Sequence, residues 1–124
     1  MRLTLNPAFD PDEALAIVEG DRDLFIELVN VFRENYPTEL SWIRDAISLR
    51  DSEALRRAAH HFRGTLSALA AGPACDAAER LEDIGRNADL TQAETMYGEV
   101  AQFVQALDAA LSDWVNYPIM RATR

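Results

Sequence analysis

The sequence predicts an all-helical (all-α) fold, an antiparallel up-down-up-down four-helix bundle with a short extra N-terminal helix. Apolar residues recur at helical spacing along most of the chain, whereas the alternating pattern of β-strands is hard to find. Glycine and proline are scarce, at five each, and most of them stand where helices should begin or end. The connections between the amphipathic stretches are short, and short connections favour antiparallel neighbours.

The size and charge of the chain set the outer limits. Its 124 residues suffice for one domain whose core needs no disulfide or structural metal. We therefore expect a single domain over residues 1–124, with the bundle at about 21–115 and a frayed tail at 118–124. No apolar run approaches the roughly 18–20 residues that span a bilayer, and the N-terminus lacks the apolar segment of a signal peptide. The net charge of -9 argues against nucleic acid or an anionic membrane as the partner. The single cysteine, Cys75, permits no internal disulfide, so the cytoplasm is the expected location.

The first two helices are marked by aspartate caps. Asp10 can cap a short helix, with Pro11 at its first position and Glu13 completing a capping box, and this helix should end near Gly20. The next begins at Asp21. Its core stripe consists of Leu24, Phe25, Leu28, Val29 and Phe32. Pro37 interrupts or kinks this helix. Helical spacing resumes at Leu40, Ile43 and Ile47, so residues 37–49 form either a continuation or a separate helix.

Three further helices are predicted in the second half. Asp51-Ser52 offers the cap of a helix from about 52 to 71. Its core stripe consists of Leu55, Ala58, Ala59, Phe62, Leu66 and Leu69. Gly72 and Pro73 end that helix and start the next. The next helix is expected to bury Ala74, Ala77, Ala78, Leu81 and Ile84. After a break at residues 87–89, Thr91 and Glu94 form a capping box. The last helix, which runs until Pro118, is expected to bury Met96, Val100, Phe103, Val104, Leu107, Leu111 and Trp114.

One face of the predicted helix at 52–71 carries reactive and charged groups. At about 100° per residue, His60 lies roughly 160° from Phe62 of the core stripe, so His60 faces water. Within roughly 60° of His60 on that wheel lie Glu53, Arg56, Arg57, Arg63, Gly64, Ser67 and Ala71. An exposed neutral imidazole is nucleophilic near neutral pH. Arg63, one turn away, can offset negative charge added to it. Glycine in a helix interior costs about 1 kcal/mol relative to alanine. An exposed Gly64 directly above His60 therefore indicates that a partner must approach the imidazole closely.

This segment resembles the signature of histidine phosphotransfer domains, a pattern close to A-H-x-L-K-G-S. Residues 59–65, Ala-His-His-Phe-Arg-Gly-Thr, fill the pattern in order, with conservative changes at three places. Further positions that resemble the family are Glu19-Gly20-Asp21, Glu27-Leu28, Phe32, Pro37, Leu69 and Leu81-Glu82. The resemblance covers roughly residues 10–113. Ala70 replaces the family's common glycine, which we interpret as a packing change, and Arg63 replaces its lysine. We expect function to survive both.

The resemblance implies a phosphorelay intermediate of two-component signalling. His60 would accept a phosphoryl group from the aspartyl phosphate of a response-regulator receiver domain and pass it to another receiver, with Mg²⁺ supplied by the receiver. Arg63 would stabilise the phosphoryl charge, Gly64 would give the partner access, and Thr65 would place a hydroxyl near the site. No nucleotide-binding motif is present, so we expect a phosphocarrier without its own ATP site or cofactor rather than an enzyme. Receiver domains and a hybrid histidine kinase are the implied partners, and the chain should be a monomer. Met1 and the tail beyond Trp114 favour a freestanding protein.

Other interpretations stay open for several residues. His61, about 100° round the helix from His60, should pack or hydrogen-bond structurally but is the rival acceptor. Arg56, Arg57 and Ser67 are candidate partner-binding residues, although a solvated face is the simpler interpretation. Cys75 is assigned no chemistry. Adjacent histidines diverge on a helix, so no metal site is indicated, and the paired carboxylates such as Glu82-Asp83 form no recognisable acid–base constellation.

Two alternatives remain for the whole chain. It can be a docking module that binds a receiver or kinase without phosphotransfer, or a helical oligomer whose seam includes Trp42 and Tyr117. In the phosphorelay interpretation, the docking surface should include exposed apolar residues of the 21–49 region beside His60.

Overall fold

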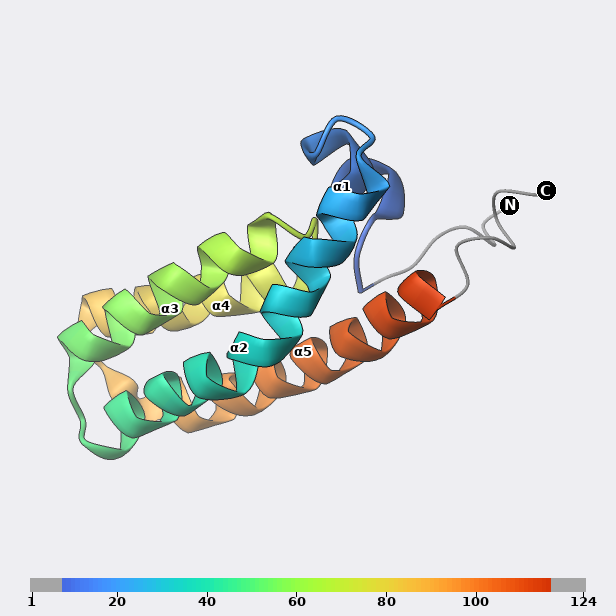
Figure 1. Ribbon diagram of the computed structural model, residues 1–124. Coiled ribbons are helices and arrows are strands. Elements are labelled where there is room, and N and C mark those ends of the chain that lie inside the picture. Colours follow the sequence, from blue (N-terminus) through green and yellow to red (C-terminus); the bar gives the residue numbers. More distant parts are fainter. Residues whose placement is uncertain (1–7, 117–124) are drawn as a thin grey trace.

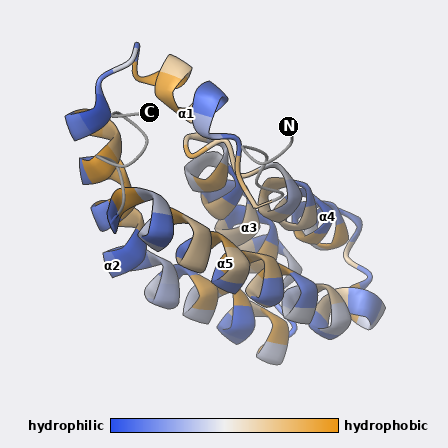
Figure 2. Ribbon diagram, turned by 90° about the vertical axis from the view of Figure 1, so that its right-hand side faces the viewer, coloured by the Kyte–Doolittle hydropathy of each residue, from blue (hydrophilic) through white to orange (hydrophobic). Residues whose placement is uncertain are grey.

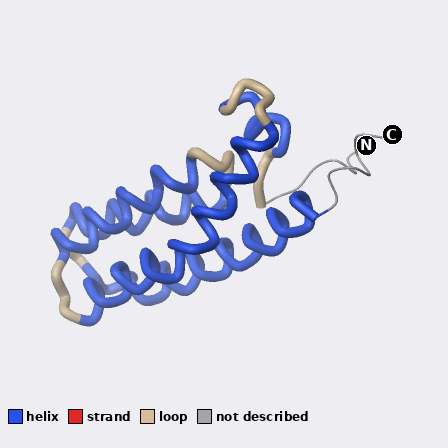
Figure 3. Tube along the Cα trace, in the orientation of Figure 1, coloured by secondary structure: helices blue, strands red, loops and turns tan. Residues whose placement is uncertain are grey.

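The structure is a computed structural model that describes residues 8–116 (Figure 1). Every regular element within this range is helical, which confirms the all-helical prediction (Figure 3). The helices are α1 (Pro11–Ile17), α2 (Arg22–Ser48), α3 (Ser52–Ser67), α4 (Gly72–Asn87), the short 3₁₀ helix η2 (Leu90–Gln92) and α5 (Ala93–Asn116). The predicted tail at 118–124, and Tyr117 with it, lies outside the described residues.

The four long helices share one core. α3 packs against α4 and α2, and α5 packs against α4 and α2, while the short α1 packs against α2. Bands of hydrophilic and hydrophobic residues alternate along the long helices, as expected of amphipathic helices that each bury one face (Figure 2).

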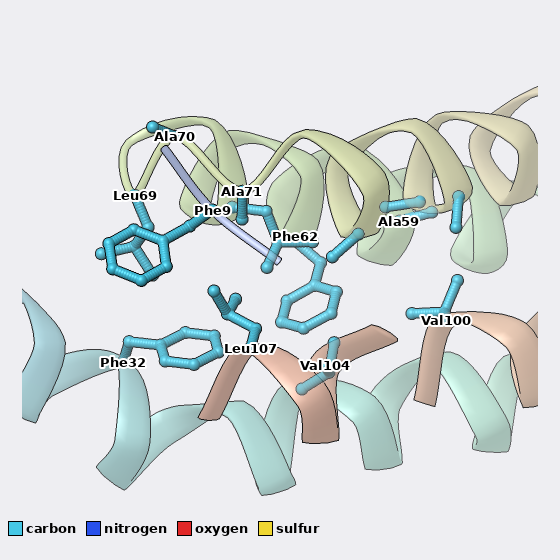
Figure 4. Packing of buried hydrophobic residues seen from close by; sticks show 14 of the residues in the cluster. Phe9, Phe32, Ala59, Phe62, Leu69, Ala70, Ala71, Val100, Val104 and Leu107 are labelled. Atoms are coloured by element: carbon cyan, nitrogen blue, oxygen red, sulfur yellow. The ribbon is translucent and has the colours of Figure 1, made fainter. Parts of the chain in front are cut away.

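The predicted stripes supply most of the core. Phe62 of α3 is fully buried and points toward Val104 and Leu107 of α5 (Figure 4). Two members of the predicted stripes, Leu24 and Phe103, were wrongly assigned to the core, because they remain 42% and 38% exposed. Both stand at the edge of their stripe, directly before the buried Phe25 and Val104. A helix that packs on its neighbours along a stripe leaves such edge positions partly in solvent.

Aspartates begin three of the helices, as predicted. Asp10, Asp21 and Asp51 each accept a hydrogen bond from a backbone N–H three residues on, at 3.0–3.1 Å. The predicted capping box at Asp10 is only half made, because the backbone N–H of Asp10 donates to Ala70 instead of to Glu13. The box at Thr91 was wrong. Asp89 caps this segment and accepts from the backbone and the hydroxyl of Thr91, which produces the short 3₁₀ turn before α5.

Pro37 lies inside α2, which settles the alternatives left open for residues 37–49 in favour of a continuation. A proline in a helix interior removes one backbone hydrogen bond and costs about 3 kcal/mol. Buried residues on both sides of it, such as Phe32 and Ile43, keep the two halves packed on the same core. Two polar interactions between α2 and α5 add to this packing. The Tyr36 hydroxyl donates a hydrogen bond to Asp108 of α5 at 2.6 Å, and Arg33 forms an ion pair with the same carboxylate at 2.7 Å.

The end of α3 was predicted at about 71 but lies at Ser67. Ala70 has a φ of +56° and so lies in the left-handed region. The N–H of Ala71 donates to Leu66 O and that of Ala70 to Ser67 O. This pair of hydrogen bonds is the Schellman motif, in which glycine usually takes the left-handed position. The departure from the family at Ala70 therefore concerns the backbone and is more than the packing change that we expected.

Candidate functional site

His60 lies in the third turn of α3, on the face opposite the buried Phe62. Its side chain is 60% exposed, as the helical wheel predicts. The exposed face lies next to α4, the helix that packs most extensively on α3. The chemistry available to His60 therefore depends on what α4 presents to it.

α4 presents a buried carboxylate. Nδ1 of His60 lies 2.9 Å from Oε2 of Glu82, whose side chain is only 4% exposed. Nε of Arg63 donates to Oε1 of Glu82 at 2.8 Å, and Nη2 of Arg86 donates to Oε2 at 3.1 Å. A carboxylate can be buried at tolerable cost only when it is paired in this way.

The contacts keep Glu82 ionised. Burial alone raises the pKa of its carboxyl, but hydrogen bonds from Arg63 and His60 outweigh burial and hold the pKa below the ordinary value of 4.5. An ionised carboxylate only accepts hydrogen bonds. Nδ1 of a neutral His60 must therefore carry the proton and donate a hydrogen bond to Glu82. The lone pair then lies on Nε2, the nitrogen that the Glu82 contact leaves free.

Arg63 also lies beside the imidazole, with Nη2 at 3.3 Å from Nδ1. Because Nδ1 already donates to Glu82, this approach places a positive charge near the ring rather than making a hydrogen bond to it. The arrangement is one exposed imidazole, one buried anion and two guanidiniums, those of Arg63 and Arg86. Arg86 pairs with Asp83 as well.

Two glycines near the site have different reasons to be glycine. A Cβ added at Gly64 would meet nothing within 4 Å, so packing within the chain does not require glycine there. A Cβ at Gly85 of α4 would lie 2.6 Å from the backbone nitrogen of Arg56 and 2.8 Å from the carbonyl oxygen of Ser52. Gly85 therefore lets the backbones of α3 and α4 touch, one turn beyond Glu82, whereas Gly64 leaves open space above His60.

The remaining candidate residues lie apart from the imidazole. Arg56 and Arg57 both pair with Glu53 at 2.6 and 3.3 Å, and Ser67 is exposed. The Thr65 hydroxyl donates to the backbone carbonyl of His61 at 3.4 Å, within its own helix. The structure thus brings Arg63 to His60 but brings neither Arg56, Arg57, Ser67 nor the Thr65 hydroxyl into contact with the ring.

His61 faces the other neighbour, α2. Its Nε2 lies 3.4 Å from Oε2 of Glu39, and its ring centroid lies 6.4 Å from that of Trp42. The two adjacent histidines therefore each meet a buried carboxylate, but on different helices. Within the described residues, the structure records no arginine contact for His61, in contrast to His60.

A groove between α2 and α3 lies beside His61. It has a volume of about 220 Å³ and is lined by Leu28, Val31, Phe32, Asn35, Glu39, Thr65, Ala68 and Leu69. We call it the α2–α3 groove. Val31 is 54% exposed and Trp42, nearby on α2, is 53% exposed, so this side of the molecule offers apolar surface in the 21–49 region.

Sequence reasoning missed Glu82, Arg86 and Gly85 as site residues. The match of Leu81-Glu82 to the family's Leu-Glu pair was the available signal for Glu82, but it received no role. For Arg86 the only signal was its spacing of four residues from Glu82, which places both side chains on one face of a helix. Nothing in the sequence distinguished Gly85 from a helix-breaking residue.

Between residues 8 and 116, no group of three or more His, Cys, Asp and Glu side chains is placed to hold a metal ion. No helix in the same part of the chain has the length and apolar character needed to cross a membrane.

Comparison with known proteins points to one family. The family model described as the Hpt domain matches residues 27–110, more than half of the chain. No curated protein gives a significant match. Among solved structures, the crystal structure of histidine-containing phosphotransfer protein B (HptB) from Pseudomonas aeruginosa PAO1 is similar, with a TM-score of 0.82 at 21% sequence identity. The match covers 88% of this chain and 95% of that one, and at this identity it shows a shared fold.

Proposed function

Because the chain belongs to the Hpt domain family, we propose that His60 carries a phosphoryl group from one receiver domain to another. Family membership gives the chain a histidine phosphotransfer role in a phosphorelay, without an ATP site of its own. The histidine, the donor, the acceptor and the direction of transfer belong to the proposal. One observation supports His60 most strongly: its Nδ1 faces the buried, ionised Glu82, which leaves the nucleophilic lone pair on Nε2.

The proposed step is an in-line displacement. Nε2 of His60 attacks the phosphorus of a receiver's aspartyl phosphate, the bond between phosphorus and the aspartyl oxygen breaks, and its electron pair returns to the aspartate carboxylate. The imidazole keeps its proton on Nδ1 and becomes positively charged, and Glu82 stabilises this charge at 2.9 Å. Enzymatic phosphoryl transfer depends mainly on positioning and electrostatics, so few groups are needed. The receiver supplies Mg²⁺ in this proposal, and Arg63 supplies further positive charge near the transferred group.

We propose that the receiver docks over Gly64 and the adjoining α2–α3 groove. The open space at Gly64 lets another surface approach the imidazole, and Val31 in the groove and Trp42 beside His61 offer exposed apolar contacts. Thr65 lines the groove instead of contacting His60, so its role would be in docking. Alanine substitution of Val31 and Trp42 should weaken receiver binding, and unchanged transfer rates in both variants would contradict this docking surface.

The arrangement of the chain in solution is part of the same proposal. Only residues 49–51 connect α2 to α3, and only residues 68–71 connect α3 to α4. Connections this short support the antiparallel up-down-up-down bundle that the sequence predicted. We propose a monomer in the cytoplasm, and sizing chromatography would show a dimer at once if the exposed Trp42 formed a seam between copies.

The deciding experiment is phosphoryl transfer from a phosphorylated receiver in the presence of Mg²⁺. Wild type, His60→Gln and His61→Gln are compared. We expect label on the wild type and on the His61 variant but not on the His60 variant. Loss of label only in the His61 variant would make His61 the acceptor. Absence of label with several receivers that nevertheless bind a folded protein would favour the docking module without phosphotransfer.

A further variant isolates the role of Glu82. Glu82→Gln keeps an oxygen that can accept a hydrogen bond from Nδ1 but removes the negative charge. Hydrogen bonds to charged groups contribute about 1.5–3 kcal/mol, so the transfer rate should fall roughly tenfold or more while His60 is still labelled. Asp76→Asn, at an exposed carboxylate of the same helix outside these contacts, removes the same formal charge and should leave the rate nearly unchanged. Equal rates in both variants would show that the charge of Glu82 does not act on the imidazole.

A further inference from the structure

Glu39 is a buried carboxylate, and one of its two oxygens lacks a hydrogen bond within the described residues. It is 9% exposed, and Glu82 is the other acidic residue buried to this degree within residues 8–116. Glu82 has two arginines and a histidine as partners, whereas the ion pair recorded for Glu39 is with the exposed His61 at 3.4 Å. Oε1 of Glu39 is buried and has no hydrogen-bond partner in the described part of the chain. Buried charged groups are normally paired. A donor for this oxygen would therefore have to come from outside the described residues.

Glu39 lies in the α2–α3 groove, whose other walls are mainly apolar. Leu28, Val31 and Phe32 of α2 face Ala68 and Leu69 of the α3 end across it. Sites for drug-sized ligands measure roughly 300–1,000 Å³. At about 220 Å³ the groove instead suits a single long side chain.

The chemistry of the groove selects a cationic side chain. Lysine and arginine bury their methylene stems along apolar surface and keep the charged group at a polar end. The groove suits such a side chain, because its apolar walls can cover the methylene stem and the Glu39 carboxylate can pair with the charged group. The net charge of -9 also favours a basic partner surface.

The groove lies where a docked receiver would cover it. Ala68, which lines the groove, lies one helical turn beyond Gly64 and about 40° round the helix from it, and His61, which contacts Glu39, lies about 100° round from His60. A surface that reaches the imidazole past Gly64 therefore meets the groove as well.

We propose that Glu39 is a partner-selecting residue: a lysine or arginine side chain of the receiver enters the α2–α3 groove and pairs with its carboxylate. This inference rests on the proposed function, since the partner is the receiver that reacts at His60. The terminal torsion of a glutamate side chain is soft, so a small rotation turns Oε1 toward the arriving cation. A receiver without a cation at this point leaves the carboxylate unpaired and docks more weakly, which makes the pair a device of specificity.

The test measures transfer from a phosphorylated receiver to the full chain over a range of receiver concentrations. Glu39→Gln keeps the shape of the side chain and removes its charge. Glu34→Gln is the matched control, because Glu34 is an exposed carboxylate of α2 about 140° round the helix from Glu39. Coupling of close charge pairs across interfaces predicts a KM about tenfold higher for Glu39→Gln, with kcat nearly unchanged and a weaker dependence of KM on salt. The control should stay within about twofold of wild type, as expected for a solvated charge.

A second variant keeps the proposal testable if Glu39→Gln does not fold. Ala68→Phe fills the groove from the exposed end of α3 and leaves Glu39 in place. It should also raise KM. Unchanged KM in a folded Glu39→Gln variant or in Ala68→Phe, or a fall in kcat alone, would overturn the inference while His60 labelling keeps the proposed function intact. Failure of wild type to accept label would overturn the proposed function, and this inference with it.

Discussion

Replacement of Gly64 by alanine should make the protein more stable and a poorer phosphocarrier. A Cβ at this position meets nothing within 4 Å, so the methyl group adds no strain inside the chain. Alanine in a helix interior is more favourable than glycine by about 1 kcal/mol. For a domain of this size that gain raises Tm by roughly 3–5 °C.

The loss of transfer follows from the same open space. If a receiver packs over Gly64 to reach His60, a methyl group there over-packs the interface at a cost of about 1–3 kcal/mol. That cost lowers transfer roughly 5- to 150-fold. The matched control is Gly98→Ala on α5, where an added Cβ likewise meets nothing within 4 Å. Gly98 lies on a helix that contributes no residue to the site.

The assays are thermal unfolding followed by circular dichroism and transfer from a phosphorylated receiver. Both variants should unfold at a higher temperature than wild type, and only Gly64→Ala should transfer more slowly. Wild-type transfer by Gly64→Ala would refute the access argument. Equal slowing of both variants would show that helix rigidity, rather than access to His60, limits transfer.

Three further predictions concern stability. Gly85→Ala forces a Cβ against the α3 backbone at 2.6–2.8 Å and should lower the free energy of unfolding by about 1–3 kcal/mol in urea titrations; an unchanged midpoint would contradict the close helix contact. Ala88→Gly should raise stability by about 1 kcal/mol, because this exposed residue has a φ of +60°; no rise in Tm would argue against backbone strain there. Tyr36→Phe should cost about 1–2 kcal/mol, because it removes the hydrogen bond from the Tyr36 hydroxyl to the Asp108 carboxylate. Burial and then this hydrogen bond raise the pKa of Tyr36 to about 12 and so favour the neutral phenol. Since the folded pKa is raised, this contribution is fully present below pH 10.0 and is lost as the pH rises through about 12; tyrosinate absorbance should show one high-pKa group in wild type that is missing from the variant.

The sequence predicted the helices well because their signals are local. Aspartate caps and apolar spacing depend on residues within a turn or two, and Asp21 and Asp51 cap as expected. The end of α3 was misplaced for a physical reason. An alanine at residue 70 gives no sign that it adopts the left-handed conformation, and glycine at residue 72 suggested a later end.

The site was predictable on α3 and not across to α4. The helical wheel placed His60 in solvent and Arg63 beside it, and both placements agree with the structure. Glu82 lies 22 residues away, and its contact depends on how α3 and α4 pack. A pattern along one helix carries no information about the distance to its neighbour, so the carboxylate that orients the imidazole could be named only from the structure.

The short distance between α3 and α4 depends on Gly85. His60 and Glu82 belong to helices whose backbones approach closely at Gly85, where an added Cβ would lie 2.6–2.8 Å from backbone atoms of Arg56 and Ser52. A sequence that retained His60, Arg63 and Glu82 but carried a larger residue at 85 would hold every reactive group and yet hold them too far apart. The chemistry of the site therefore depends on a residue without a side chain. A comparison of functional groups alone would not detect the loss of this residue.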